Sequence, residues 1–196
     1  MNKPLDLRVG FTRLDQATAA DFAIMHKHMA AEHAHLADNV LNHLRLSGDQ
    51  QPGLQVTRME HALQTATRAF KDGADDELVV CALLHDVGDA LAPDNHGAFA
   101  SEILRPFLSD ANYNLVRYHP EFQGYFFFDK IGADPNMRER HRGKAWFDTC
   151  HHFCERWDMP AFDPAYASMP LSAFEPLVRR VFDKQPVHNG VALPTK

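Results

Sequence analysis

The stretch Leu78-Val-Val-Cys-Ala-Leu-Leu-His85-Asp86-Val-Gly88 decides how the rest of the chain is interpreted. It is an apolar run typical of a buried helix, and it ends in a histidine and an aspartate side by side. Removing an imidazole and a carboxylate from water together is costly unless a partner compensates for it, and a bound cation does this well. The pair therefore predicts a metal site inside a helical core.

Size and composition are those of an ordinary globular domain. The chain has 196 residues, of which 45% are hydrophobic and 23% are charged, and this length can bury a substantial core. We expect a single domain over residues 1–196. The net charge of −6 and the lack of a basic stripe argue against nucleic acid as a partner.

Compartment and cysteine chemistry can also be predicted. The chain has no apolar run long enough to cross a bilayer, and its start lacks the features of a secretory signal, so we expect a cytoplasmic protein without a membrane partner. Three cysteines then predict free thiols. Cys150 and Cys154 flank two histidines, which is compatible with zinc. No second ligand pair of that type exists, so buried thiols on one helical face are the favoured interpretation.

Hydrophobic residues recur at steps of three and four through nearly the whole chain, which predicts an all-α, compact helical bundle. We expect an N-terminal helix over residues 15–46, with a capped start at Thr18, and a metal-binding core over about 50–182. Most histidines of the N-terminal helix are expected to face water. Within the core, helices are predicted over about 56–71, 75–91, 96–108, a segment ending at 117–119 before Pro120, 144–157 and 171–182. An irregular aromatic lining is expected over 122–131.

Four histidines and two aspartates fall where a helical bundle can direct them inward. They are His61, His85, Asp86, His96, His119 and Asp158. Such a set can hold two borderline metal ions with one carboxylate between them. Asp86 is the natural bridge, because it lies at the centre of the set.

The order His…His-Asp…His…His…Asp resembles the HD-domain superfamily over roughly residues 50–182, and Leu-Leu-His85-Asp86-Val-Gly is a good copy of its signature. A mononuclear phosphohydrolase of this superfamily needs only His61, His85, Asp86 and a late aspartate. The two further histidines make the chain similar to the mixed-valent di-iron oxygenases, the branch of myo-inositol oxygenase and 2-amino-1-hydroxyethylphosphonate oxygenase.

Three segments carry this second resemblance: Glu60-His61-Ala-Leu-Gln, Val116-Arg-Tyr-His119 and Glu155-Arg-Trp-Asp158. For the final aspartate, Asp148 and Asp163 remain alternatives. The resemblance implies two iron ions, Fe(II)/Fe(III), held by the six residues. It also implies dioxygen and a small hydroxylated substrate that is oxidised and cleaved.

Two other functions stay open. The first is an HD-type phosphohydrolase that acts on a phosphate ester or nucleotide with Mn, Mg or Zn, where the metals activate water. The second is a non-catalytic helical module with a structural metal, whose coordination positions would all be filled by protein. The oligomeric state does not follow from the sequence.

Departures from the oxygenase pattern bear on the substrate. Asp89 stands where these oxygenases place a lysine or histidine that touches the substrate, and Gln123 stands where the phosphonate enzyme has a lysine. We expect Asp86 and Asp89 to be catalytic, and Asp89, Gln123, Tyr118 and Tyr125 to contact the substrate. Like charges repel strongly in a low-dielectric pocket, so Asp89 favours a cationic or neutral substrate. The aromatic residues can equally be core, and Asp89 can equally orient a ligand histidine.

Overall fold

The computed structural model describes residues 8–184, and this part of the chain contains helices and turns but no strand. The all-α prediction is confirmed. The α-helices are α1 (Ala19–His33), α2 (Leu36–Gly48), α3 (Arg58–Lys71), α4 (Asp76–Leu84), α5 (His96–Leu104), α6 (Asp110–Gly124), α7 (Phe147–His152) and α8 (Leu171–Phe182). Short 3-10 turns lie at Leu14–Gln16, Pro93–Asn95, Arg105–Phe107, Phe128–Ile131 and Met137–His141, and a π-helical segment covers Phe153–Asp158.

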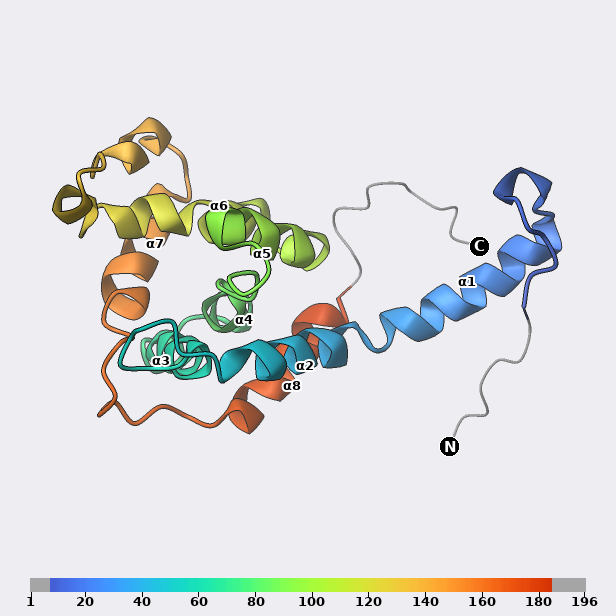
Figure 1. Cartoon of the computed structure of the whole chain (residues 1–196), viewed down its shortest axis with the longest axis horizontal. Coiled ribbons are helices and arrows are strands. Elements are labelled where there is room, and N and C mark those ends of the chain that lie inside the picture. The colour runs from blue at the N-terminus through green and yellow to red at the C-terminus, as the bar shows by residue number, and fades with distance from the viewer. Residues whose placement is uncertain (1–7, 185–196) are drawn as a thin grey trace.

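The single N-terminal helix expected over 15–46 is divided in two. α1 begins as the sequence indicated, because the Thr18 side chain accepts from the backbone of Asp21 and the Asp21 side chain accepts in return. It buries no residue and extends away from the other helices (Figure 1). α2 instead packs against α3 and α8. Only the second half of the predicted helix has a core to pack on, which allows the two halves to diverge at residues 34–35.

α4 is the central helix of the core. Its residues from Val79 to Leu84 are all buried, as the apolar run predicted, and it contacts α3, α6, α8 and the π-helical segment. The helix ends at Leu84 rather than near residue 91. Tight turns follow, in which the amides of Val87 and Asp89 donate to the carbonyls of Leu84 and Asp86. The His-Asp pair therefore lies just past the helix end, where the chain changes direction.

α6 does not end before Pro120 as predicted, because it continues to Gly124 with the proline in its interior. A proline inside a helix removes one backbone hydrogen bond, namely the bond to the carbonyl four residues earlier. Packing compensates for this loss, since Leu115, Val116 and Phe122 are all fully buried. After Gly124 the chain forms turns and a short 3-10 helix, so the irregular stretch expected over 122–131 begins at residue 125.

The last part of the described chain has a helix of mixed type. α7 continues directly into the π-helical segment, in which the amide of Met159 donates to the carbonyl of Cys154, five residues earlier. π-helical turns of this kind occur often at functional sites. The predicted final helix over 171–182 is present with those bounds as α8.

Two further expectations can be compared with the described residues. Cys81, Cys150 and Cys154 are buried and free of disulfides, in agreement with the thiol prediction. In the range 8–184, no helix combines the length and the apolar character that crossing a bilayer requires. A single domain over residues 1–196 stays a prediction.

Candidate metal centre

The six residues singled out in the sequence come from different parts of the fold and meet at one place. They are His61 on α3, His85 and Asp86 after α4, His96 at the start of α5, His119 on α6 and Asp158 at the end of the π-helical segment. Three overlapping groups of them have ligand atoms within 4.8 Å of one another. The structure therefore brings together residues that are up to 97 positions apart.

The Asp86 carboxylate lies between two pairs of imidazoles. Its Oδ2 atom is 3.4 Å from Nε2 of His61 and 3.2 Å from Nε2 of His85. Its Oδ1 atom is 3.4 Å from Nε2 of His96 and 3.2 Å from Nε2 of His119. A carboxylate in this position can bridge two cations, each held by one oxygen and one pair of rings.

The main chain orients all four rings. Each Nδ1 atom lies within hydrogen-bond distance of a backbone carbonyl. The acceptors are Ala161 for His61, Ala82 for His85, Pro93 for His96 and Val116 for His119, at 3.1, 2.9, 3.1 and 2.7 Å. A ring nitrogen facing a carbonyl must carry the proton, so a neutral ring presents the lone pair of Nε2 to the centre. Metal-binding histidines are commonly held in this way.

Pro120 leaves free the Val116 carbonyl that orients His119. In a regular helix the amide of residue 120 would donate to the carbonyl of Val116, but a proline has no amide proton. That carbonyl is therefore free to accept the Nδ1 proton of His119. The proline that the sequence indicated as a helix end is thus part of the support of the site.

Two glycines allow the helices that carry the histidines to approach closely. A Cβ atom on Gly88 would lie 2.7 Å from the Phe99 ring and 3.1 Å from the carbonyl of His96. A Cβ atom on Gly97 would lie 2.9 Å from the carbonyl of Arg117. Any larger residue would push α5 away from the end of α4 or from α6. These glycines therefore keep His96 beside the other residues of the cluster.

The Asp158 carboxylate shows that the centre suits a cation. It is fully buried, its Oδ1 atom lies 3.2 Å from Nε2 of His61, and Gln123 donates to the same oxygen at 3.0 Å. Its Oδ2 atom is buried without a hydrogen-bond partner among the described residues. A buried carboxylate oxygen without a partner is costly. A metal ion at the centre would remove that cost.

The electrostatics of the site favour positive charge. Burial lowers the pKa of His61, but hydrogen bonds to Asp158 and Asp86 and the charges of both carboxylates outweigh it and raise the pKa to about 9. Burial alone would raise the pKa of Asp158, yet His61 and His85 hold it below its ordinary value. Both acids are therefore ionised at neutral pH and attract a cation.

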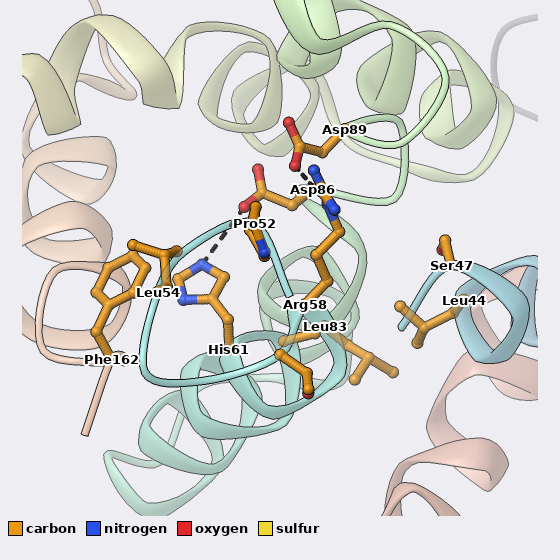
Figure 2. A pocket seen from close by; sticks show the side chains of 12 residues that line it. Leu44, Ser47, Pro52, Leu54, Arg58, His61, Leu83, Asp86, Asp89 and Phe162 are labelled. Carbon is orange, nitrogen blue, oxygen red and sulfur yellow. Dashed lines mark hydrogen bonds and ion pairs between the residues drawn. The ribbon is translucent and has the colours of Figure 1, made fainter. Parts of the chain in front are cut away.

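A pocket of about 510 Å³ opens to solvent beside the centre (Figure 2). Its wall includes the apolar side chains of Leu44, Leu54 and Phe162, and the Phe162 ring stacks on His61 at 4.5 Å. His61 and Asp86 also line it. Asp86 keeps 28% of its side chain exposed, whereas Asp158 is fully buried. The pocket thus gives access to the Asp86 carboxylate.

Asp89 lines the same pocket, but it is not a free carboxylate. Arg58 donates from Nε to Oδ2 of Asp89 at 2.6 Å (Figure 2). The expectation of a cationic or neutral substrate depended on an unpaired Asp89, and the ion pair removes that premise. Arg58 was missed in the sequence, although it lies one helical turn before His61 and so on the same helix face, which is a usable signal.

The other residues expected at the substrate lie elsewhere. Gln123 binds Asp158. The ring of Tyr118 stacks on Trp146 at 5.5 Å, and the Tyr125 ring is covered by the guanidinium of Arg138 at 3.3 Å. Apart from Asp89, the residues predicted to contact the substrate do not line the pocket of Figure 2; they are Gln123, Tyr118 and Tyr125. Their substrate contact stays a prediction.

The histidines of α1 and α2 behave largely as expected. His26, His33 and His35 are exposed. His43 instead donates from Nε2 to the carbonyl of Val87 at 3.0 Å. This bond attaches α2 to the turn that follows the His-Asp pair, so one histidine of the cluster does support the site.

Comparison with known proteins agrees with this geometry. Residues 58–145 match the HD domain family. The chain contains an HD domain. The matched range includes the first five of the six converging residues, and Asp158 lies beyond it. The order of histidines and aspartates in the sequence had indicated this domain.

A curated relative indicates which HD proteins the chain is similar to. It is the [1-hydroxy-2-(trimethylamino)ethyl]phosphonate dioxygenase (glycine-betaine-forming) of Leisingera caerulea, which is 33% identical over 92 residues. The aligned part covers 41% of this chain and 47% of the relative. The chain therefore spans about half the length of the curated relative that it matches. That relative is named as a dioxygenase, and an oxygenase branch of the HD superfamily is what the sequence resembles.

Proposed function

We propose that this HD-domain protein is a dinuclear iron oxygenase that oxidises and cleaves a small hydroxylated substrate. The observation that carries the proposal is the position of the Asp86 carboxylate, whose two oxygens each face a different pair of imidazoles. A one-metal hydrolase would have no use for the second pair, His96 and His119. Similarity to a dioxygenase supports oxygen chemistry at this site.

The donor set fits two iron ions. Imidazole and carboxylate ligands together suit iron. His61, His85 and Asp158 would hold one ion with Oδ2 of Asp86, and the other two histidines would hold the second with Oδ1. Each ion would then have at most four protein donors, which leaves room for substrate and dioxygen. When bound, the iron pair would supply dioxygen binding and one-electron chemistry, which amino-acid side chains lack.

The protein's own part is orientation and the exclusion of water. Backbone carbonyls hold the Nδ1 protons of the four rings, so that the Nε2 atoms stay directed at the centre. Phe162 covers one face of His61, and Leu44 and Leu54 add apolar surface to the pocket wall. A substrate in this pocket is removed from bulk water, where polar contacts to it become stronger.

The substrate is inferred from the pocket and the relative together. The name of the relative describes a small molecule with a hydroxyl, a trimethylamino and a phosphonate group. The pocket lies beside the centre and has Asp86 in its wall. We infer that the substrate presents a hydroxyl group to the metal centre.

Anaerobic purification followed by metal analysis and iron spectroscopy tests the proposal. We expect two iron ions per chain, a coupled Fe(II)/Fe(III) signal after partial oxidation, and oxygen consumption with [1-hydroxy-2-(trimethylamino)ethyl]phosphonate or another small hydroxylated phosphonate. A phosphohydrolase would instead hold Mn, Mg or Zn and release phosphate from a phosphate monoester under nitrogen. That second outcome would contradict the proposal.

A further inference from the structure

The pocket beside the metal centre has an uneven distribution of charge. Its lining contains Arg58, the candidate ligand His61 and the acids Asp86 and Asp89, while the remaining wall is mostly apolar. With metal bound, His61 would be a neutral ligand, which leaves Arg58 as the cationic side chain of this lining. Asp86 faces the four imidazoles and would be neutralised by metal. Asp89 is already paired with Arg58. Apart from the metal ions themselves, a ligand in the loaded pocket would therefore meet Arg58 as the charged side chain of this lining that still has bonding capacity.

The guanidinium is held firmly but not saturated. Its Nε atom donates to Asp89 at 2.6 Å, and its Nη1 atom donates to the side-chain oxygen of Gln50 at 3.0 Å. Within residues 8–184, Nη2 has no acceptor. Arg58 keeps 21% of its side chain exposed, and it lines the pocket wall together with Asp86 (Figure 2). A planar guanidinium that is held through two of its nitrogens presents its free N–H groups in a defined direction, which suits binding of an oxyanion.

We propose that Arg58 binds an oxyanion group of the substrate, a phosphonate or a carboxylate, while the hydroxyl end of the same molecule lies at Asp86. Asp89 is a positioning residue that orients Arg58. This inference rests on the proposed function, because it names a substrate class for the same centre. It also reverses the substrate charge first expected from Asp89.

The apolar wall explains why this single contact would be strong. Leu44, Leu54 and Phe162 contribute apolar side chains to the pocket wall, so an anion that lies against them loses part of its hydration. In that setting a charge-assisted hydrogen bond is stronger than in water. A neutral compound of the same shape would fill the apolar wall but leave the free N–H groups of Arg58 without an acceptor, which is unfavourable.

The test measures ligand binding by calorimetry with the anaerobic iron-loaded protein. Three probes of similar size are compared: (1-hydroxyethyl)phosphonate, lactate and neutral propane-1,2-diol. The wild type should bind at least one of the two anions at least about tenfold more tightly than the diol. The anion that binds more tightly identifies the oxyanion class.

Variants assign the preference to Arg58. Arg58→Gln should lower anion affinity at least about tenfold and leave diol affinity unchanged, and Arg58→Lys should retain part of the affinity, because the charge remains and the fork is lost. Asp89→Asn should weaken anion binding without changing diol binding, which a purely structural role would not produce. Arg45→Gln is the matched control, since Arg45 is a partly exposed cation paired with Glu175 and does not line the pocket.

The outcomes separate this inference from the proposed function. If Arg58→Gln and Arg58→Lys both bind the anions as the wild type does, or if the wild type binds the diol equally well, the Arg58 proposal is overturned even when two iron ions are present. If the anion preference disappears in Arg58→Gln but the protein hydrolyses a phosphate monoester under nitrogen, the oxygenase proposal fails and the Arg58 proposal stands. Melting curves of each variant show which of them fold.

Discussion

The ring of His119 is held by a carbonyl that Pro120 leaves free. The Nδ1 atom of His119 donates to the Val116 carbonyl at 2.7 Å, and the residue that would normally occupy that acceptor is the proline. One position thus removes a helix hydrogen bond and orients a candidate metal ligand.

Restoring the amide at this position should weaken metal binding while leaving the helix intact. In Pro120→Ala the new amide competes with His119 for the Val116 carbonyl, so we expect metal affinity to fall about 10–100-fold with a melting temperature equal to or above that of the wild type. Competitive chelator titration and thermal unfolding measure the two effects. Pro176→Ala, which changes the proline inside α8, should leave metal affinity unchanged. Equal affinity of Pro120→Ala and wild type would contradict the role assigned to the proline.

Removal of single ligands should distinguish a two-ion centre from a one-ion centre. His96→Ala removes a donor from one side of Asp86 only, so the variant should retain one ion per chain. Asp86→Asn weakens both sides and should retain neither. Elemental analysis of anaerobically loaded protein gives the ion count, with exposed His26→Ala as the control. Loss of all metal in His96→Ala would argue for one shared ion.

Gly97 should tolerate no side chain. In Gly97→Ala the new Cβ would lie 2.9 Å from the Arg117 carbonyl and 3.1 Å from the Pro120 ring. The strain of separating α5 from α6 should lower the free energy of unfolding by about 1–3 kcal/mol. It should also lower the affinity for the ion next to His96. Denaturant unfolding and metal counts measure both effects. Gly10→Ala, where no atom lies within 4 Å, should be neutral, and a neutral Gly97→Ala would show that the close approach is not required.

Stability of the metal-free protein should decrease as pH rises above neutrality. The pKa of His61 is about 9, because Asp158 and Asp86 outweigh the opposing effect of burial. A histidine whose pKa is raised above its ordinary value near 6.5 stabilises the fold fully below pH 6.5, and this contribution is lost as pH rises to about 9. Denaturant unfolding from pH 6 to 9.5 should show the decline in the metal-free wild type and a flatter profile in His61→Gln.

Metal loading at pH 7 should release protons from the protein, because metal replaces the proton of His61. Calorimetry in two buffers of different ionisation enthalpy detects this release. No proton release would show that His61 is neutral before metal binds.

The sequence predicted the site best where a residue type is rarely found in its surroundings without a functional reason. An imidazole and a carboxylate inside an apolar run require compensation, and this requirement identified the His85-Asp86 pair and the helix that carries it. The convergence of His61, His96 and His119 was expected because their order along the chain resembles that of the HD-domain superfamily. The all-α fold followed from periodicity, because helical repeats are visible in one segment at a time.

Features that depend on contacts between distant segments were not predictable in the same way. The Arg58–Asp89 ion pair joins residues 31 positions apart, and its absence from the sequence reasoning led to the wrong premise of an unpaired Asp89. Pro120 was interpreted by its local effect, whereas packing of α6 decides that the helix continues. The π-helical segment that carries Asp158 has no local signal of its own.

The four ring acceptors are main-chain oxygens, and this has a consequence for mutagenesis. Alanine scanning deletes side chains and leaves every carbonyl in place, so it would find the imidazoles and miss the groups that aim them. Only substitutions that change the path or the hydrogen bonds of the backbone affect these carbonyls. Such substitutions are made at prolines and glycines, which a scan of polar residues omits.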